Sequence, residues 1–313
     1  RDVAPSRGLG DVYKRQAGRD SMGRKKKERL ESVLYTIPAI VLVCVVFYIP
    51  FVMGGYYSLT KWNGIAKEPV FIGFKNYMTL LESSSGFLTS LGFTARYTIL
   101  FMILANVFAL AIAVALTKKI VGVSVFRSMF FIPYIMSMTI VGFIWKFIFS
   151  QGFAVLYEKT SLEFLNWSWL GSGKLAFYSV VFVGVWQALG FYIVLYIAGL
   201  QAVPTDVLEA ATIDGANGVN KFFRVTLPLL KPSIITCVFM SLTNSLKVFD
   251  IILALTKGGP GESTYSATMD IYREAFQKNN YGLGSAKAIV FFVIVLVITQ
   301  LVMKLMNSID KDA

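Results

Sequence analysis

The sequence predicts an all-α integral membrane protein with six transmembrane helices. Of its 313 residues, 56% are hydrophobic and only 15% are charged, whereas a soluble domain usually carries about 25% charged residues. Several uncharged stretches reach the roughly 20 residues that a helix needs to cross the hydrocarbon core of a bilayer. The scarcity and the spacing of the charges therefore favour a bundle of membrane helices over one or two soluble domains.

The first three spans follow from uncharged stretches and from the charges that flank them. Residues 32–60 contain no charge, and this run is too long to be the apolar core of a signal peptide. The second span is placed between Arg96 and Lys118. The third contains Pro133, which is expected to kink it because proline removes a backbone hydrogen bond from the helix.

The last three spans are bounded in the same way. The fourth lies within the uncharged stretch 175–205, and the sixth lies between Lys287 and Lys304. The fifth is interrupted by Lys247 and Asp250, which could pair on one helix face because they are three residues apart. The predicted spans are 34–57, 96–117, 125–149, 176–200, 233–256 and 287–306, which together make a transmembrane domain over 34–306.

Basic residues are concentrated in segments that would share one side of the membrane. The tail 22–33 carries five Lys and Arg residues within six positions, and the loops after the second and fourth spans add more. Cytoplasmic loops are enriched in these residues, so we expect the tail and the C-terminal segment 307–313 to lie in the cytoplasm. Residues 1–21 precede Met22 without apolar periodicity and are expected to be a non-native leader.

The composition excludes several kinds of catalytic site. The chain has no His, so it lacks a His-based nucleophile relay and an imidazole metal site. Its two Cys are too few for a four-cysteine zinc site, and no G-x-x-x-x-G-K-[ST] phosphate loop occurs. We therefore expect no enzyme activity, no metal and no cofactor in this chain. The net charge of +12 is attributed to membrane-orienting loops, with no nucleic acid as partner.

The cytoplasmic loop 202–232, between the fourth and fifth spans, is the most informative segment. It is about 30 residues long, whereas a simple connection needs only a few. Pro204 ends the preceding helix, and either Thr205 or Asp206 can cap a new one. Asp206 and Glu209 have the spacing of a capping box. The loop therefore predicts a short helix on the cytoplasmic surface.

The end of this short helix and the return to the membrane are also marked in the sequence. Gly215, and also Gly218, can supply the left-handed residue that ends the helix. Pro228 and Pro232 are expected to fix the point of re-entry. Such an exposed helix can fit a groove in a partner protein. The alternative is a helix lying on lipid, which its acidic residues disfavour because they are repelled by anionic headgroups.

Eight residues of this loop keep a characteristic spacing: Glu209, Ala210, Ala211, Asp214, Gly215, Ala216, Leu227 and Pro228. The pattern resembles the EAA loop of ABC-importer permeases, and its one departure is Val225 in place of Ile. Three further segments resemble carbohydrate permeases of the maltose and glycerol-phosphate type, namely Tyr35–Gly64, Phe71–Leu81 and Val248–Tyr265. The resemblance extends over the chain from about Arg24.

The resemblance implies a type I ABC-importer permease fold whose EAA helix is a cytoplasmic coupling helix. Two permease chains, expected to be a heterodimer, would form the pathway in the bacterial cytoplasmic membrane, in contact with lipid. Separate ATPase subunits would bind ATP and Mg, and an extracytoplasmic solute-binding protein would deliver the substrate. Glu209 would make the polar contact with the ATPase, Ala210 and Ala211 would allow close docking, and Gly215 would make the turn.

The substrate path is predicted from polar and aromatic residues at membrane depth, because polar side chains there are costly against lipid and tend to face a cavity or another helix. Sugars need hydroxyl-pairing groups and flat aromatic faces. The candidates are Tyr134, Trp186, Gln187, Phe191, Asn244, Ser245 and Lys247. Each of them could instead make contacts between helices. Lys247 and Asp250 could form a structural ion pair as readily as they could contact a ligand.

The leading interpretation is thus the membrane subunit of an ATP-driven, binding-protein-dependent importer of a sugar or oligosaccharide. The second is a secondary transporter or channel that acts alone on a polar solute. That class would need internal repeats or coupling-ion sites, and no repeat is evident between the two halves. The third is an integral membrane enzyme, which would need clustered acids, whereas Asp250 is the only acid within a predicted span. The sequence does not identify the sugar.

Overall fold

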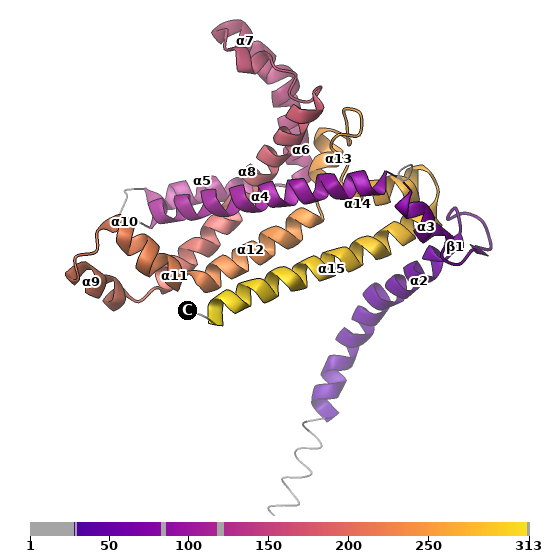
Figure 1. Ribbon diagram of the computed structural model, residues 1–313, viewed down its shortest axis with the longest axis horizontal. Coiled ribbons are helices and arrows are strands. Elements are labelled where there is room, and N and C mark those ends of the chain that lie inside the picture. The colour runs from indigo at the N-terminus through magenta and orange to yellow at the C-terminus, as the bar shows by residue number, and fades with distance from the viewer. Residues whose placement is uncertain (1–27, 29, 83–85, 118–121, 312–313) are drawn as a thin grey trace, which may run out of the picture. The chain divides into compact units, whose positions relative to one another are not determined.

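The computed structural model describes residues 28, 30–82, 86–117 and 122–311, and these are mostly helical (Figure 1). The chain forms two compact units, Arg1–Tyr56 and Tyr57–Ala313. The predicted leader 1–21 lies outside the described residues, as does most of the basic tail 22–33.

The first unit is a single helix within its described part. The helix runs over Leu30–Ser58, so that it includes the predicted span 34–57 and continues past the end of the unit. A π-helical turn, η1 (Cys44–Tyr48), leads into α2 (Ile49–Ser58). None of its apolar stretch is buried inside the structure. A helix that is apolar on all sides is stable in lipid, as expected of a membrane span.

The second unit begins with a small hairpin and continues as a helical bundle. Strands β1 (Thr60–Lys61) and β2 (Val70–Phe71) pair antiparallel and precede α3 (Lys75–Leu81). The buried Asn76 amide of α3 donates to the carbonyls of Ser58 and Thr60, both at 2.8 Å. The helices and helical turns that follow are α4 (Phe87–Leu116), α5 (Val123–Ile135), α6 (Met138–Phe147), η3 (Ile148–Gly152), α7 (Phe153–Thr160), η4 (Glu163–Asn166), α8 (Gly173–Ala202), α9 (Thr205–Ile213), α10 (Gly218–Lys221), η5 (Phe222–Thr226), α11 (Leu227–Leu229), α12 (Lys231–Leu246), α13 (Asp250–Leu255), α14 (Ala267–Tyr272), η6 (Arg273–Gln277) and α15 (Tyr281–Lys311).

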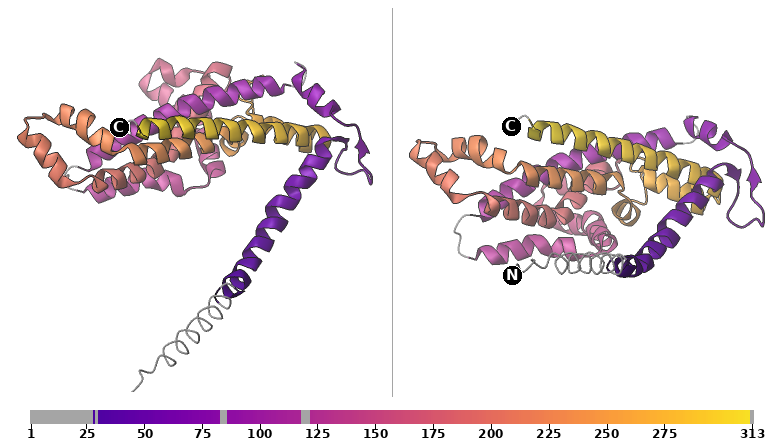
Figure 2. Two further views of the ribbon diagram at one scale, coloured as in Figure 1. Left: turned by 60° about the horizontal axis from the view of Figure 1, so that its bottom comes forward. Right: turned by 90° about the horizontal axis from the view of Figure 1, so that it is seen from below.

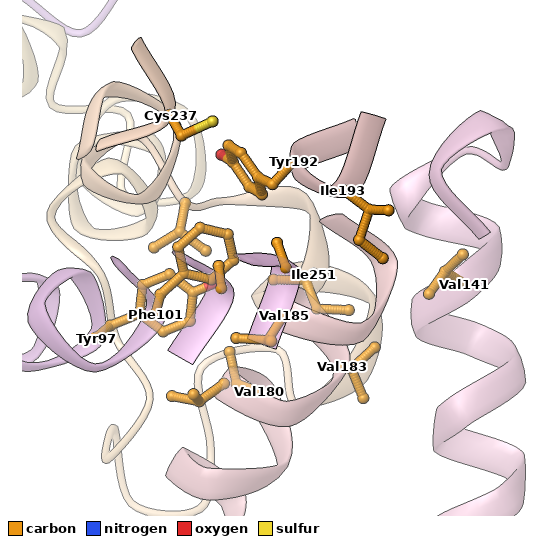
Figure 3. Close-up of a cluster of buried hydrophobic side chains, with 14 of the residues drawn as sticks. Tyr97, Phe101, Val141, Val180, Val183, Val185, Tyr192, Ile193, Cys237 and Ile251 are labelled. Atoms are coloured by element: carbon orange, nitrogen blue, oxygen red, sulfur yellow. The ribbon is translucent and has the colours of Figure 1, made fainter. Parts of the chain in front are cut away.

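Helix α8 is the centre of this bundle. It packs against α4, α5, α12 and α13, and two thirds of its apolar stretch is buried. Figure 3 shows the core that results, with Tyr97 and Phe101 from α4 facing α8 side chains such as Tyr192, and with Ile251 from α13 nearby. On α4 the evenly spaced Ala105, Ala109 and Ala113 are fully buried, because small side chains let helices approach closely.

Gly190 sets the distance between α5 and α8. A Cβ at this position would collide with the carbonyl oxygen of Phe130 and would lie 2.7 Å from the Cα of Phe131. Both obstacles are backbone atoms of α5, so a side-chain rearrangement cannot remove the clash. The close approach of these two helices therefore requires glycine.

Gly190→Val is expected to lower the free energy of unfolding by about 1–3 kcal/mol, the usual cost of overpacking a core. The reason is that α5 must move away from α8. Thermal unfolding in detergent, followed by circular dichroism, measures the effect. Gly92→Ala on α4 is the control, because nothing lies within 4 Å of a Cβ added there. Equal unfolding temperatures for the two variants would contradict this account of the α5–α8 contact.

Five helices among the described residues are long and apolar enough to cross a membrane, and a bent pair makes a sixth span if it is counted as one. The five are Leu30–Ser58, Phe87–Leu116, Met138–Thr160, Gly173–Ala202 and Tyr281–Met306. The bent pair is Gly218–Leu229 with Lys231–Leu246, at an angle of 70°. Helix α4 begins at Phe87, before the start that was predicted at Arg96. Arg96 lies on an exposed face of the helix, so its charge does not mark the N-terminal boundary.

The third span differs from the predicted kinked helix over 125–149. Helix α5 continues through Pro133 and ends at Ile135, and Met136 and Ser137 are extended, with ψ values of 144° and 132°. The chain then turns, so that α6 and α7 run across the direction of α5 (Figure 1). The predicted span 125–149 is therefore interrupted by a break after Ile135, where only a kink at Pro133 was expected. The carbonyls freed by the break find a donor on α8, which is described below.

The fifth span is also broken. Helix α12 ends at Leu246 and α13 begins at Asp250, with Phe249 between them at φ −144° and ψ −60°. One helix over 233–256 was expected, with Lys247 and Asp250 on the same face. The break separates these two residues; both are exposed, and no ion pair joins them in the structure. The prediction that they could pair on one helix face is wrong.

The two ends of the second unit differ in character. The segment α9–α11 lies at one end of the long helices, and the β1–β2 hairpin lies at the opposite end (Figure 2). Helix α15 runs from the hairpin end towards the α9–α11 end. The candidate functional residues lie between these ends and in the segment α9–α11.

Candidate functional site

A cavity of about 180 Å³ lies where the two helix breaks meet α8. Its walls come from α4, from the ends of α5 and α6, from α8, and from the break between α12 and α13. Six of the seven residues predicted for the substrate path line this cavity: Tyr134, Gln187, Phe191, Asn244, Ser245 and Lys247. Residues from three separate predicted spans are thus brought together at one place.

Gln187 supports the break between α5 and α6. Its buried side-chain amide donates to the carbonyls of Tyr134, at 3.3 Å, and Met136, at 3.4 Å. Carbonyls that lack helical partners are costly at membrane depth unless another donor reaches them or they line a water-filled cavity. Gln187 therefore has a structural role in holding the break open.

A pair of stacked aromatic rings forms one wall. The centroids of Tyr134 and Phe191 are 5.0 Å apart, and the ring planes differ by 23°. Tyr134 keeps 38% of its surface exposed, so its ring is available to a molecule in the cavity. Apolar ring faces next to amide groups can bind a solute that has both C–H faces and hydroxyls.

Another wall is the end of α12 with the break that follows it, and it carries Asn244, Ser245 and Lys247. The carbonyl of Val248, freed by this break, accepts hydrogen bonds from Ser266 at 2.8 Å and Thr268 at 2.5 Å. Lys247 and Asn244 are exposed. This wall is therefore polar and fixed from behind by the chain that leads into α14.

Trp186 is the one predicted path residue that does not line the cavity. Its indole packs edge-on against Trp145, with ring centroids 5.4 Å apart. The adjacent Gln187 points to the cavity, and neighbouring residues on a helix face in different directions. Trp186 therefore belongs to the contact between α6 and α8.

A polar network on α4, α8 and α12 was missed in the sequence. The Asn106 amide donates to the hydroxyl of Ser241 at 2.9 Å, and the hydroxyl of Tyr196 donates to the Asn106 carbonyl oxygen at 2.7 Å. Tyr196 and Ser241 are buried. The signal available in the sequence was a lone amide in an otherwise apolar span, which must find partners on other helices.

The exposed segment α9–α11 carries the other predicted site. Helix α9 has no buried residue, and Glu209, Ala210 and Asp214 are exposed. Gly215 has φ +81°, and its N–H donates to the Thr212 carbonyl at 3.1 Å. The Ala216 N–H donates to the Ala211 carbonyl at 3.0 Å. These two bonds make a Schellman motif, so the prediction that Gly215 ends the helix is confirmed.

Two details of this loop differ from expectation. Pro204 occupies the N-cap of α9, and no side chain caps the helix. A capping box needs a free N–H at the N-cap, which proline lacks, so the prediction of a cap at Thr205 or Asp206 is wrong. Gly218 is the first residue of α10, and the Asn217 side chain caps that helix at 2.9 Å. Leu227 and Pro228 are the first two residues of α11, directly before the 70° bend.

A buried ion cluster lies near the hairpin end. The fully buried Lys287 ammonium contacts Asp270 at 2.8 Å and Glu274 at 3.0 Å, and Lys278 also pairs with Glu274. Burial raises the pKa of Asp270, although Lys287 opposes this. Burial would also raise the pKa of Glu274, but hydrogen bonds from Lys287 and Lys278 hold it below its usual value. The cluster ties α14 and η6 to α15.

Two helix breaks that meet at a polar cavity, in a bundle of membrane-length helices with an exposed helical loop at one end, are typical of a membrane transport subunit. The chain belongs to the family of binding-protein-dependent transport system inner membrane components, whose sequence pattern matches residues 105–312.

Individual relatives agree with this assignment. The chain is 40% identical over 266 residues to the "Probable starch degradation products transport system permease protein AmyD" of Thermoanaerobacterium thermosulfurigenes, over 85% of this chain and 90% of AmyD. It is 36% identical over 276 residues to the "Multiple sugar-binding transport system permease protein MsmF" of Streptococcus mutans, over 88% of this chain and 95% of MsmF.

The fold is also similar to that of a solved structure. A chain of a bacterial ABC transporter involved in the import of the acidic polysaccharide alginate superimposes with a TM-score of 0.78 at 22% identity. The match covers 91% of this chain and 98% of that one. The fold is therefore the type I ABC-importer permease fold.

Proposed function

We propose that this chain is the permease subunit of an ATP-driven importer that moves a sugar or oligosaccharide across the bacterial cytoplasmic membrane by alternating access. The observation that carries the proposal is the cavity at the two helix breaks. Its stacked rings of Tyr134 and Phe191 offer flat faces to a sugar ring, and Asn244 and Ser245 offer partners for hydroxyls. The names of AmyD and MsmF, which refer to starch degradation products and sugars, support a carbohydrate.

A second permease chain would complete the pathway. At about 180 Å³, the cavity is smaller than the roughly 300–1,000 Å³ of typical ligand pockets. Asn244, Lys247 and Asp250 are exposed beside it, which is costly at membrane depth unless another surface covers them. A different permease chain in a heterodimer would supply the facing half.

The segment α9–α11 would dock on a separate ATPase that binds ATP and Mg. In this role Glu209 makes the polar contact, and the small Ala210 and Ala211 allow close approach. Asp214, Gly215 and Ala216 form the turn, and Leu227 and Pro228 pass the movement to α12. The absence of buried residues in α9 supports docking, because its side chains are exposed or only half-buried.

The orientation follows from the docking role. If α9–α11 faces the cytoplasm, the hairpin end faces outwards, where a solute-binding protein would deliver the substrate. Helix α15 runs towards the α9–α11 end (Figure 2), which supports a cytoplasmic C-terminus. The basic tail supports a cytoplasmic N-terminus.

Phe191→Ala tests the proposed cavity. Uptake at limiting substrate is expected to fall about 10-fold, because an aromatic contact is worth up to about 1.5 kcal/mol. The substrate is first identified by titrating the binding protein of the same system with a panel of saccharides in a calorimeter, and uptake of the labelled sugar is then measured. Phe143→Ala is the control, because Phe143 is exposed on α6 and does not line the cavity. Unchanged uptake in Phe191→Ala would contradict the assigned path.

A further inference from the structure

A second and larger cavity opens between α4 and α8. Its volume is about 890 Å³, and its third wall is the loop at 261–263. This volume lies within the roughly 300–1,000 Å³ range of ligand pockets. None of the residues assigned to the substrate path lines it, so it is distinct from the cavity at the helix breaks.

Two cations stand at the wall of this cavity. Arg96 comes from α4, and Lys174 comes from the first turn of α8. Both are exposed, and neither forms an ion pair within the described part of the chain. The acidic lining residue Glu262 is engaged elsewhere, in an ion pair with Arg273. The cavity therefore presents positive charge that has no counter-ion from this chain.

Below the cations the walls are apolar. Ile99 and Ile103 lie one turn apart on α4 and expose 56% and 51% of their surfaces, so they share one helix face. Phe177 and Tyr178 face them from α8. Arg96 lies roughly 14 Å along α4 from its first residue. From Arg96 to Ile103 the groove thus changes from cationic to apolar, and Thr89 and Phe93 line it on the other side of Arg96.

We propose that this groove binds an anionic phospholipid, with the headgroup phosphate between Arg96 and Lys174 and an acyl chain along Ile99 and Ile103. Basic side chains near a bilayer surface attract anionic headgroups by charge. Long basic side chains can reach the headgroup level while their stems stay in the apolar region. A soluble phosphate would gain nothing from the isoleucine walls, and a neutral sugar would leave both cations without a counter-charge. The charge and the apolar surface together select a lipid.

Native mass spectrometry of the full chain, purified with its accompanying subunits, tests this site. The complex is equilibrated in nanodiscs of mixed phosphatidylglycerol and phosphatidylcholine. The wild type is expected to retain phosphatidylglycerol selectively. In Arg96→Gln/Lys174→Gln this preference is expected to fall about 10-fold, since each basic residue near an anionic surface contributes to the free energy of lipid binding. Lys67→Gln/Lys159→Gln is the matched control, because both lysines are exposed and lie outside the groove.

A second variant tests the apolar part separately. Ile103→Trp fills the groove without changing the cations, and it is expected to reduce lipid retention while the unfolding temperature stays near that of the wild type. Free glycerol phosphate, which has no acyl chain, is expected not to displace the lipid. Equal phosphatidylglycerol preference in Arg96→Gln/Lys174→Gln and the wild type would overturn the proposal. Displacement by glycerol phosphate would also overturn it, because the site would then recognise phosphate alone.

Discussion

Glu209→Lys is expected to abolish uptake while the chain still inserts and folds. Glu209 is exposed on a helix without buried residues, so the substitution removes no packing contact. In the proposed complex it places a positive charge where the ATPase meets a carboxylate. Breaking one partner of a buried charge pair at an interface costs about 2–5 kcal/mol, or more than about 30-fold in affinity. The amount of ATPase that co-purifies with the tagged chain measures the loss without knowledge of the substrate.

Two further variants sharpen this prediction. Glu158→Lys is the matched control, because it makes the same charge change at an exposed position on α7, outside the segment α9–α11, and normal co-purification is expected. Gly215→Pro is expected to act like Glu209→Lys, because proline cannot adopt φ +81° and lacks the N–H that bonds Thr212. Normal ATPase binding in Glu209→Lys would show that α9 is not the docking helix.

Lys287→Met is expected to destabilise the protein by about 3–5 kcal/mol, the cost of leaving buried charges without their partner. Methionine fills much of the same volume, but Asp270 and Glu274 would then share a buried site without the central ammonium. The unfolding temperature of the detergent-solubilised chain, followed by circular dichroism, measures the effect.

The size of this effect is tested by two comparisons. Lys278→Gln is the control, because this lysine pairs with the same Glu274 but keeps 49% of its side chain exposed, and exposed pairs contribute about 0–1 kcal/mol. Adding Asp270→Asn and Glu274→Gln to Lys287→Met is expected to restore most of the stability, because no buried charge is left. If Lys278→Gln were as damaging as Lys287→Met, the buried cluster would not be what holds α14 and η6 to α15.

The features that depend on local chemistry could be predicted from the sequence. Apolar stretches located the helices, since lipid requires internally bonded backbone and apolar surface. Gly215 was correctly predicted to end α9, because few residues adopt a positive φ. The path residues were chosen for their polarity at membrane depth, and six of the seven line one cavity.

The features that depend on contacts between helices could not be predicted. The break after Ile135 is stabilised by Gln187, which lies about 50 residues later in the chain, and Pro133 alone suggested only a kink. The break after Leu246 relies on hydroxyls of Ser266 and Thr268. Lys287 was treated as a span boundary, yet it is fully buried, because its two carboxylate partners lie in a different segment.

The two breaks give the permease assignment a structural basis. A regular helix satisfies its own backbone hydrogen bonds, whereas a break frees carbonyls and N–H groups that can face a polar solute. Here both breaks open onto one cavity, and α12, which forms one of its walls, is joined through the 70° bend to the segment α9–α11. A displacement of that segment by an ATPase would therefore change the wall of the cavity directly.

The most direct test is ATP-driven uptake by the purified complex in proteoliposomes, with the binding protein and its labelled sugar outside. Accumulation of the labelled sugar is expected to require hydrolysable ATP on the side of α9. It is expected to stop with a non-hydrolysable analogue and to persist when ion gradients are dissipated. Accumulation that follows an ion gradient and continues without the ATPase would contradict the proposed ATP-driven importer and would favour a transporter that acts alone.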